Sequence, residues 1–263
     1  MRDNCRISLK RRRVLLITND DGIHAMGLCA LHEALKDDYE IYVVAPDSER
    51  SAVGHAITLV DPLRVRSVRH NGRLFGWAIN GTPADCVKLA VYEIVKNPIE
   101  FVVSGINTGA NVGINVLYSG TVSAATEAAM LGIPSMAISL NTLKDPDFCT
   151  SAYIAPKLVE WAMELSLPGG VSLNVNVPAG SPLNIKGVKW TRQGLSQYKE
   201  QFDKRIDPRG NVYYWQASKE IAHKEGDDVD STALDMGYIT ITPLKYDLTA
   251  YEYIEKFGFP SCF

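Results

Sequence analysis

The stretch Val14-Leu15-Leu16-Ile17-Thr18-Asn19-Asp20-Asp21-Gly22 decides the fold. Its first five residues are apolar or β-branched, which is typical of a strand buried on both faces of a parallel sheet. Two acids follow at the carboxyl end of that strand, where open α/β sheets bind their ligands. Adjacent ionised carboxylates repel each other, so we expect a hard divalent cation at Asp20 and Asp21. Asn, Asp and Gly are also turn residues, and a plain turn that ends the strand explains the pattern equally well.

Short apolar runs alternate with amphipathic segments from Val14 onward, the pattern of βαβ units around a mostly parallel sheet. The sequence therefore predicts an α/β fold. Strands are predicted at residues 14–18, 40–45, 101–104, 135–139 and 171–177, and helices at residues 27–36, 83–96 and 123–131. The start of the second helix is marked by Thr82 as an N-cap, by Pro83 at the first helical position and by Asp85 near the positive end of the helix dipole.

Beyond about residue 179 polar, aromatic and charged residues take over. Hairpin arms or strands are predicted at residues 190–198, 211–216 and 238–243, and the acidic run at 225–230 is expected to be a solvated loop, with pairing across a subunit boundary as the alternative. We divide the chain into a flexible tail (1–12), a catalytic core (13–185) and a hairpin and helix region for oligomerisation (186–263).

A hairpin that carries Tyr213, Tyr214 and Trp215 buries little against itself. We therefore expect these aromatic side chains to meet another subunit, although they could instead fold back onto their own core.

Composition limits the classes of function. Hydrophobic residues make up 46% and charged residues 22% of the 263, which is ordinary for a globular domain and excludes a mainly disordered chain. A net charge of -3 gives no field for nucleic acid. The five scattered cysteines lack the spacing of a zinc or redox motif, so we expect free thiols in a reducing, cytoplasmic compartment. No apolar run is long enough to cross a membrane, and no secretory signal pattern is present.

Three further segments follow predicted strands and so belong to the same edge of the sheet. Residues 45–55 offer Ser51 as a metal ligand and Arg50 or His55 to face a phosphate, although a solvated polar loop is the simpler explanation. Residues 103–115 are rich in Gly and Asn, so the backbone can approach a ligand and amide oxygens such as that of Asn107 can bind a metal. Residues 118–124 place hydroxyls and free amides at the start of a helix, where phosphate binds.

Together these segments predict one pocket for metal-assisted phosphoryl chemistry. They match neither the dinucleotide fingerprint nor the Walker motif, and no nucleophile elbow is present. The remaining histidines, at positions 24, 32, 70 and 223, are expected to be packing or surface residues.

Several motifs, in order along most of the chain, closely resemble the SurE family of survival-protein nucleotidases. They are Thr18-Asn19-Asp20-Asp21-Gly22, Val44-Ala45-Pro46-Asp47 with Glu49-Arg50-Ser51-Ala52, Gly81-Thr82-Pro83-Ala84-Asp85-Cys86-Val87, Ser104-Gly105-Ile106-Asn107 and Tyr118-Ser119-Gly120-Thr121-Val122. The similarity continues through Thr191-Arg192-Gln193, Tyr213-Tyr214-Trp215, Asp227-Asp228-Val229-Asp230 and Gly237-Tyr238-Ile239-Thr240-Ile241-Thr242-Pro243.

The resemblance implies a Rossmann-like three-layer core with a carboxyl-terminal extension exchanged between the subunits of a homodimer or homotetramer. It also implies a phosphatase that depends on one divalent ion per subunit, Mg²⁺ or Mn²⁺, and hydrolyses nucleoside monophosphates. The expected substrates are 5′-nucleotides, with 3′-nucleotides and short polyphosphate as further candidates.

The family's site residues map onto numbered positions of this chain. The implied metal ligands are Asp20, Asp21, Ser51 and Asn107, and Asp20, Asp21 and Asn107 are the implied catalytic residues. The implied substrate contacts are Asn19, Gly54, His55, Asn111, Ser119, Gly120 and Thr121. Thr108 and Asn115 depart from the usual family pattern: Thr108 stands where a basic or other residue is common, and Asn115 stands where the family usually has Asp. Neither departure removes a ligand.

The residues leave some alternatives open. In the hydrolysis step, the group that attacks the phosphorus is either a metal-bound water or Asp20 itself. A protein that binds nucleotide without hydrolysing it needs the same acids, and an interaction protein built around the aromatic hairpin needs none of them.

Overall fold

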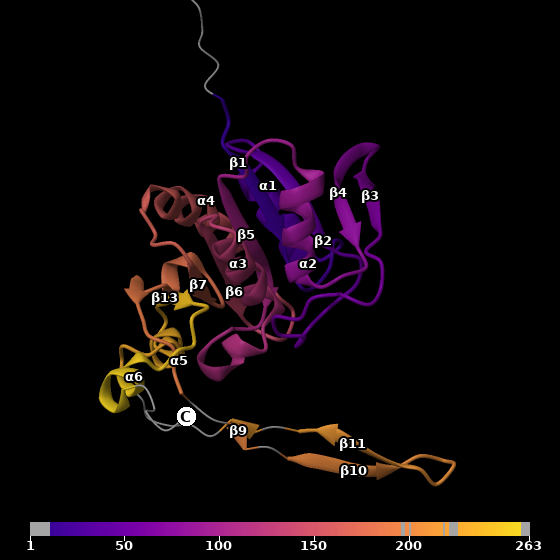
Figure 1. Ribbon diagram of the computed structural model, residues 1–263, viewed down its shortest axis with the longest axis vertical. Helices are drawn as coiled ribbons and strands as arrows, with labels where there is room; N and C mark the ends of the chain where they lie inside the picture. The colour runs from indigo at the N-terminus through magenta and orange to yellow at the C-terminus, as the bar shows by residue number, and fades with distance from the viewer. Residues whose placement is uncertain (1–10, 196–197, 200, 218, 221–225, 259–263) are drawn as a thin grey trace, which may run out of the picture.

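The computed structural model describes residues 11–195, 198–199, 201–217, 219–220 and 226–258 (Figure 1). Its centre is a nine-stranded sheet in the order β3-β4-β2-β1-β5-β6-β7-β13-β8. The strands are β1 (Val14–Thr18), β2 (Glu40–Pro46), β3 (Val65–His70), β4 (Arg73–Ile79), β5 (Phe101–Thr108), β6 (Ser135–Asn141), β7 (Val171–Pro178), β8 (Val188–Trp190) and β13 (Ile239–Lys245). The tail predicted at residues 1–12 falls mostly outside the described residues, because these begin at Arg11.

The middle of the sheet is parallel. Strand β1 pairs in parallel with β2 and β5, and the parallel pairing continues through β6 to β7. Strands β3 and β13 are antiparallel to their neighbours β4 and β7. All five residues of β1 are buried, as expected of a strand covered on both faces. The mostly parallel α/β sheet predicted from the sequence is thereby confirmed.

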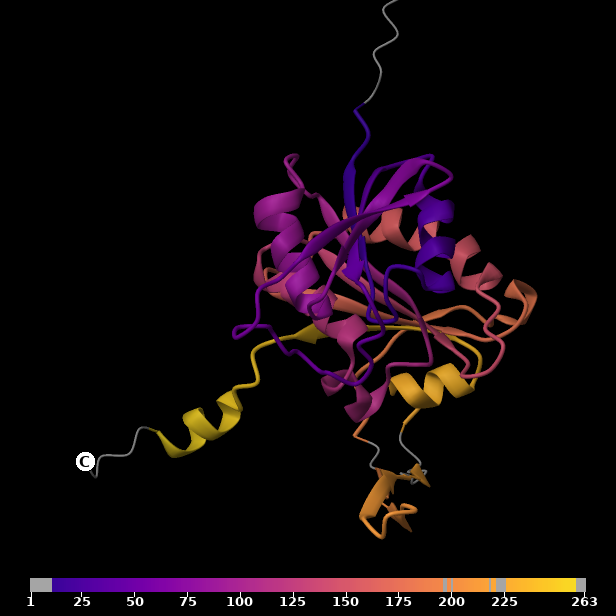
Figure 2. The same ribbon diagram turned by 90° about the vertical axis from the view of Figure 1, so that its right-hand side faces the viewer.

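Helices cover both faces of the sheet and make three layers (Figures 1 and 2). They are α1 (Met26–Leu35), α2 (Pro83–Leu89), which continues as the π-helical η1 (Ala90–Ile94), α3 (Gly120–Met130), α4 (Cys149–Glu164), α5 (Asp230–Asp235) and α6 (Tyr251–Phe257), with the short 3₁₀ turns η2 (Gly113–Leu117) and η3 (Pro182–Asn184). Helices α1 and α4 pack on one face, and α2 and α3 pack together on the other. The Rossmann-like three-layer arrangement is confirmed.

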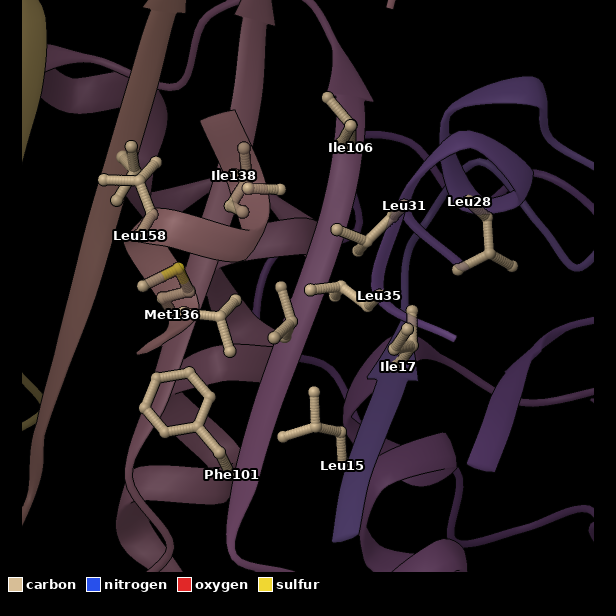
Figure 3. Packing of buried hydrophobic residues seen from close by; sticks show 14 of the residues in the cluster. Leu15, Ile17, Leu28, Leu31, Leu35, Phe101, Ile106, Met136, Ile138 and Leu158 are labelled. Carbon is tan, nitrogen blue, oxygen red and sulfur yellow. The ribbon is translucent and has the colours of Figure 1, made fainter. Parts of the chain in front are cut away.

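The larger of the two main cores lies between the sheet and the α1–α4 layer (Figure 3). Leu28, Leu31 and Leu35 of α1 belong to the same buried cluster as Ile17 and Phe101, and all five side chains are fully buried. Burying each such side chain contributes about 1.5–3 kcal/mol relative to exposure. This packing fixes α1 against the sheet. It thereby positions residues 19–25, which link the carboxyl end of β1 to α1.

Helix α3 begins three residues earlier than predicted. The sequence analysis begins it at Ser123, but Ser119 is its N-cap, because the Ser119 hydroxyl accepts a hydrogen bond from the Val122 amide at 3.1 Å. Gly120 and Thr121 therefore belong to its first turn. The start of α2 at Pro83 is as predicted, with Thr82 and Asp85 forming a capping box.

The region 186–263 contributes to the sheet as well as to an extension. Strands β8 and β13 complete one side of the sheet, whereas β10 (Phe202–Ile206) and β11 (Val212–Gln216) form a separate ribbon, and β9 (Tyr198–Lys199) pairs with β12 (Lys219–Glu220). Figure 1 shows the ribbon extending away from the nine-stranded sheet. Every residue of β10 and β11 is exposed, including the three aromatic side chains of β11.

The prediction of one strand or hairpin arm over residues 190–198 is wrong, because the residues after Trp190 do not continue β8. Strand β8 ends at Trp190, and the next residues leave the ladder. The backbone of Arg192 pairs instead with Val229, and the side chain of Gln193 donates to the carbonyl of Gly113 at 2.9 Å. Cys5, Cys262 and His223 lie outside the described residues, whereas Cys29, Cys86 and Cys149 are free thiols. None of the helices in the described ranges combines the length and apolar character needed to span a bilayer.

Candidate active site

The acid pair sits in a tight turn at the carboxyl end of β1. The Asn19 side chain closes this turn twice: its Oδ1 accepts from the Gly22 amide at 3.2 Å, and its Nδ2 donates to the Gly22 carbonyl at 3.0 Å. Gly22 has φ +98°, a conformation that glycine adopts at little cost. Asn19 is fully buried, so its side chain shapes the turn from beneath. The turn that the sequence analysis gave as an alternative is therefore present. It places Asp20 and Asp21 just beyond the carboxyl end of β1.

The surroundings of Asp20 and Asp21 disfavour the ionised forms of both side chains. Burial raises the pKa of Asp20 above its ordinary value, and only 5% of the residue is exposed. Burial and then the charge of Asp20 raise the pKa of Asp21 to about 6. The nearby charge of Glu49 raises both pKa values further. Glu49 is therefore a third acid of the site, which the sequence analysis did not assign, although it lies in the motif that carries Ser51.

The first turn of α3 meets Asp20 directly. The Thr121 hydroxyl donates a hydrogen bond to Asp20 Oδ1, and the residue is fully buried. A Cβ at Gly120 would lie 2.8 Å from Asp20 Cβ and 2.9 Å from Asp20 Oδ2, so only glycine allows this approach. The positive dipole end of the helix favours an anion beside Asp20, and the Thr121 amide also hydrogen-bonds the Asp20 carboxylate. Thr121 thus orients Asp20 with its hydroxyl, and its side chain is not open to a substrate.

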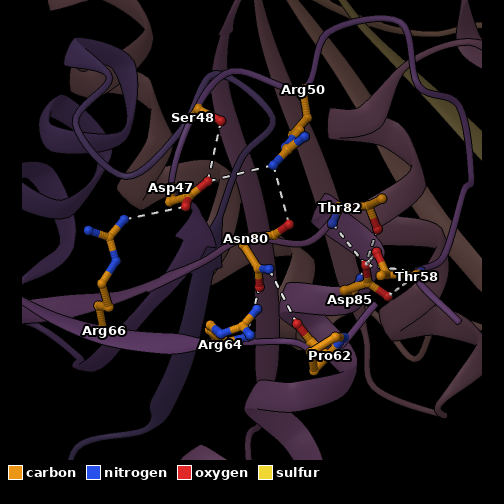
Figure 4. A network of polar contacts seen from close by, with 10 residues as sticks. All are labelled: Asp47, Ser48, Arg50, Thr58, Pro62, Arg64, Arg66, Asn80, Thr82 and Asp85. Atoms are coloured by element: carbon orange, nitrogen blue, oxygen red, sulfur yellow. Dashed lines mark hydrogen bonds and ion pairs between the residues drawn. The ribbon is translucent and has the colours of Figure 1, made fainter. Parts of the chain in front are cut away.

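Residues 47–58 form a strap that brings Ser51 to the same place. The amide of Arg50 donates to the Asp20 carbonyl at 2.7 Å, and the Ser51 hydroxyl donates to Glu49 Oε1 at 2.6 Å. The guanidinium of Arg50 points away from the acids, toward the Asn80 carbonyl at 3.2 Å and Asp47 at 3.6 Å (Figure 4). Arg50 therefore anchors the strap, and the expectation that it faces a phosphate does not fit this geometry.

Strand β5 supplies the last predicted ligand. Its register shifts between Gly105 and Asn107, and the Asn107 Nδ2 donates to the Gly109 carbonyl at 2.7 Å. With Nδ2 used in this way, Oδ1 is the free donor atom of the Asn107 side chain for a cation. The next loop is fixed by Asn111, whose Nδ2 donates to the Ser139 hydroxyl at 2.8 Å.

Residues from these segments line one cavity of about 250 Å³. Its walls are Asp20, Ser51, Ala52, Asn107, Thr108, Gly109, Ala110, Asn111, Asn115, Tyr118, Ser119 and Leu143. Of the residues predicted from the sequence, Asp20, Ser51, Asn107, Asn111 and Ser119 line it. The sequence analysis missed Tyr118 and Leu143, which are 60% and 84% exposed at its rim. An aromatic residue beside Ser119 was the available signal for Tyr118, whereas nothing marked Leu143.

The remaining predicted residues are not part of the wall of this cavity, and the half-buried Asp21, predicted as a metal ligand, is one of them. Asn19, Gly120 and Thr121 support Asp20 from behind, and Gly54 donates its amide to the Tyr118 carbonyl at 2.9 Å. His55 turns to α3, where its Nε2 lies 2.8 Å from Glu127 Oε2.

Glu127 ties the strap to both helices of its layer. Lys88 Nζ donates to Glu127 Oε1 at 2.9 Å, opposite His55, and the Glu127 side chain is only 3% exposed. Burial opposes ionisation of Glu127, but hydrogen bonds and charge from His55 and Lys88 outweigh it and lower the pKa of this carboxyl. The side chain of His55 therefore anchors the strap that carries Ser51.

Replacing Glu127 tests this anchor through its pH dependence. Because the folded pKa of Glu127 is lowered, its ionised form stabilises the protein above the ordinary value of 4.5, and this contribution is lost as the pH falls through the folded pKa. We expect Glu127→Gln to lower the free energy of unfolding by about 1–3 kcal/mol at pH 7, since a buried amide carries no charge for Lys88 and has one acceptor oxygen in place of two. The difference from the unmodified protein should shrink below pH 4.5 in urea titrations. A difference that is constant with pH contradicts the anchor.

The residues present fit a hard divalent cation. Asp20, Asp21, Ser51 and Asn107 offer oxygen atoms, the ligands that Mg²⁺ and Mn²⁺ prefer, and a cation would favour the ionised forms of the two acids, which burial and mutual repulsion disfavour. No three His, Cys, Asp or Glu side chains are grouped to hold a metal ion in the described ranges of the chain. A cation here therefore depends on the neutral oxygens of Ser51 and Asn107 as well as on the acid pair.

Fold and site together define a Rossmann-like α/β protein with an acidic ligand pocket at the carboxyl edge of its sheet. The sequence profile described as Survival protein SurE matches residues 15–200. The chain therefore belongs to the SurE family.

Several relatives carry the name 5′-nucleotidase SurE. The protein from Syntrophobacter fumaroxidans is 52% identical over 244 residues, covering 93% of this chain and 98% of its own. The protein from Syntrophus aciditrophicus is 51% identical over 241 residues, covering 91% of each chain. Among solved structures, the SurE protein from Aquifex aeolicus superimposes with a TM-score of 0.81 at 39% identity, over 93% of this chain and 98% of that one.

Proposed function

We propose that this protein is a divalent-metal-dependent 5′-nucleotidase that hydrolyses nucleoside monophosphates to nucleoside and inorganic phosphate. One observation carries the proposal: the start of α3 contacts Asp20, an acid in the pocket wall whose charge raises the pKa of the adjacent Asp21. Relatives that match nearly the whole chain are named 5′-nucleotidases, which supports the same reaction. The proposed ion is Mg²⁺ or Mn²⁺, held by Asp20, Asp21, Ser51 and Asn107.

Each residue near the acids has a part in this proposal. A bound divalent cation neutralises the acids, polarises a phosphate oxygen and activates water. Thr121 holds Asp20 in one orientation through its hydrogen bond. The positive dipole end of α3 stabilises the charge that builds on the phosphate oxygens as the P–O bond breaks. The attacking oxygen comes from water or from the Asp20 carboxylate, and both routes need Asp20 ionised.

The scope of the proposal extends to 3′-nucleotides and short polyphosphate. Residues of the loops after β5 and β6 form part of the cavity wall, which supports entry of more than one kind of phosphate ester. We place the activity in the cytoplasm, in accord with the free thiols of Cys29, Cys86 and Cys149.

Phosphate release tests the function. The protein is incubated with a panel of 5′- and 3′-nucleoside monophosphates and short polyphosphate, in Mn²⁺, in Mg²⁺ and in chelator. We expect release of inorganic phosphate with metal and almost none with chelator, because the acids then lack their counterion. Thermal melting with the same nucleotides is the second readout. Metal-dependent stabilisation by nucleotide without any phosphate release would overturn hydrolysis in favour of binding alone.

We also propose that region 186–263 forms the oligomer, as a homodimer or homotetramer with its extension exchanged between subunits. The exposed aromatic side chains Tyr213, Tyr214 and Trp215 of β11, together with Tyr253 and Phe257 of α6, support this assignment. So many exposed large apolar groups are typical of an interface. Sedimentation of the full chain measures the state directly, and a monomer at micromolar concentration would contradict it.

A further inference from the structure

Asp230 is a buried carboxylate that joins three separate segments of the chain. Its Oδ2 accepts from the Gly113 amide at 2.9 Å, and its Oδ1 accepts from the amides of Gly194 at 3.0 Å and Ser231 at 2.8 Å. The residue is fully buried at the start of α5. The expectation of a solvated acidic loop therefore fails for Asp230, and it holds for the exposed Asp227 and Asp228. Those two pair within the chain, with Lys189 and Arg192.

One of the three segments is the pocket loop, residues 109–118. The Gly113 carbonyl accepts from the Gln193 side chain at 2.9 Å, so both polar groups of the Gly113 backbone are held by residues from beyond β8. Two residues earlier, the Asn111 amide donates to Asn176 Oδ1 at 2.8 Å, and the Asn111 carbonyl accepts from Asn174 Nδ2 at 2.7 Å. The loop is thus fixed at Asn111 by side chains of β7, and at Gly113 by the side chains of Gln193 and Asp230.

The pocket loop supplies a large part of the cavity wall. Asp20, Ser51, Asn107 and Ser119 are the lining residues that meet the phosphate in the proposed reaction. Of the other lining residues, five belong to the loop that Asp230 holds at Gly113, namely Gly109, Ala110, Asn111, Asn115 and Tyr118. With its phosphate at the acids, a nucleoside monophosphate would place its nucleoside against this remaining part of the wall, which we call the nucleoside end.

We propose that Asp230 is a positioning residue for recognition of the nucleoside half of the substrate, a role that rests on the proposed nucleotidase function. It acts through Gly113 on Asn115 and Tyr118, and it touches no reacting atom. A carboxylate suits the position because it accepts hydrogen bonds at both oxygens and donates none. An amide in its place would point an NH₂ group at a backbone N–H and leave that donor unpaired.

Kinetics with two substrates test this role. For Asp230→Asn we expect KM for a nucleoside 5′-monophosphate to rise about tenfold, because the loop is displaced at the nucleoside end. With p-nitrophenyl phosphate, which lacks a nucleoside, kcat/KM should stay within about twofold, because the phosphate end is unchanged. Asp227→Asn is the matched control: it removes a neighbouring but exposed carboxylate and should leave both substrates unaffected. Equal losses on both substrates, or no loss on either, would overturn the proposal.

A second variant covers the case in which Asp230→Asn does not fold. Gln193→Ala removes one hydrogen bond to Gly113 and leaves Asp230 in place, so we expect the same selective rise in KM at smaller size. Faster hydrogen exchange at the Gly113 amide is expected in Asp230→Asn, and unchanged exchange there would contradict the contact.

If the unmodified protein releases no phosphate from either substrate, the proposed function fails, and calorimetric binding of nucleoside 5′-monophosphate then decides the inference. About tenfold weaker binding by Asp230→Asn supports it, and equal binding overturns it.

Discussion

Asp21→Asn is expected to lower metal-dependent phosphate release at least about 10³-fold and, in chelator, to raise the stability of the protein. The loss of activity follows because an amide supplies neither the charge nor the second carboxylate that the cation needs. The gain in stability follows from the pKa of Asp21, which burial and the charge of Asp20 raise to about 6. An uncharged isostere removes this repulsion and keeps the shape of the turn.

The pH dependence of this gain has a definite sign. A raised folded pKa means that the ionised side chain is less favourable in the folded protein than in the unfolded one. The penalty is absent below the ordinary value of 3.8, grows as the pH rises and is complete above about 6. Allowing for solvent access to Asp21, we expect a gain of about 1–2 kcal/mol at pH 8. That gain corresponds to a thermal midpoint about 3–6 °C higher.

Differential scanning calorimetry in chelator from pH 4 to 8, with phosphate assays alongside, measures both effects. Asp38→Asn is the matched control, because this carboxylate is exposed and lies outside the pocket. Adding Mn²⁺ should stabilise the unmodified protein and leave Asp21→Asn almost unchanged. An Asp21→Asn protein that turns over normally would contradict the assignment of this acid, and one that melts earlier in chelator would contradict the repulsion.

Gly27→Ala is expected to be the most destabilising single methyl addition near the site. A Cβ at Gly27 would lie 2.0 Å from the Ile106 carbonyl oxygen and 3.0 Å from Phe148 Cε1. The oxygen belongs to the backbone of β5, so relief requires α1 to move away from the sheet. We expect the free energy of unfolding to fall by about 3 kcal/mol, the upper range for an overfilled core. Phosphate release should fall as well, because Ile106 directly precedes Asn107.

Thermal melting checks the effect as a midpoint about 6–10 °C lower. Gly169→Ala is the control, since a Cβ there meets no heavy atom within 4 Å and the residue needs no positive φ. If Gly27→Ala and Gly169→Ala melt alike, the close packing of α1 on β5 is not what fixes this edge of the sheet.

The sequence predicted the centre of the fold well for a physical reason. Strand β1 is covered on both faces, so its residues form one continuous apolar run that fits few other structures. The edge of the sheet was harder. Strand β3 is almost wholly exposed and carries no apolar periodicity, so it was missed together with β4. The Asn71-Gly72 pair between them is the residue pair favoured in two-residue hairpin turns, and it was the signal that could have found them.

Helix α4 was missed for a different reason. Pro156 lies inside it, and a proline in the middle of a segment argues against a helix. The helix persists because Leu158, Val159 and Ala162 are buried against the sheet, so tertiary packing outweighs the local preference.

Site residues were predicted by type and position along the strands, but their partners were not. His55 bonds to Glu127, 72 residues away, and Thr121 bonds to Asp20 across two elements. Nothing in the sequence near His55 distinguishes a side chain that faces a phosphate from one that pairs with a buried acid. Long-range pairing of this kind depends on how the strap and α3 pack, which only the structure gives.

The position of β13 has a consequence for synthesis of the chain on the ribosome. Strand β13 lies between β7 and β8 in the sheet, although it comes last of the three along the chain. Within the described ranges the hydrogen-bonding partner of β8 is β13, so Val188–Trp190 must wait unpaired until Ile239–Lys245 has emerged. The ribbon of β10 and β11 is made during that interval. The nascent chain therefore exposes an open edge at β7 until Ile239–Lys245 has been translated, which is the period when a chaperone or a second nascent copy has most access to it.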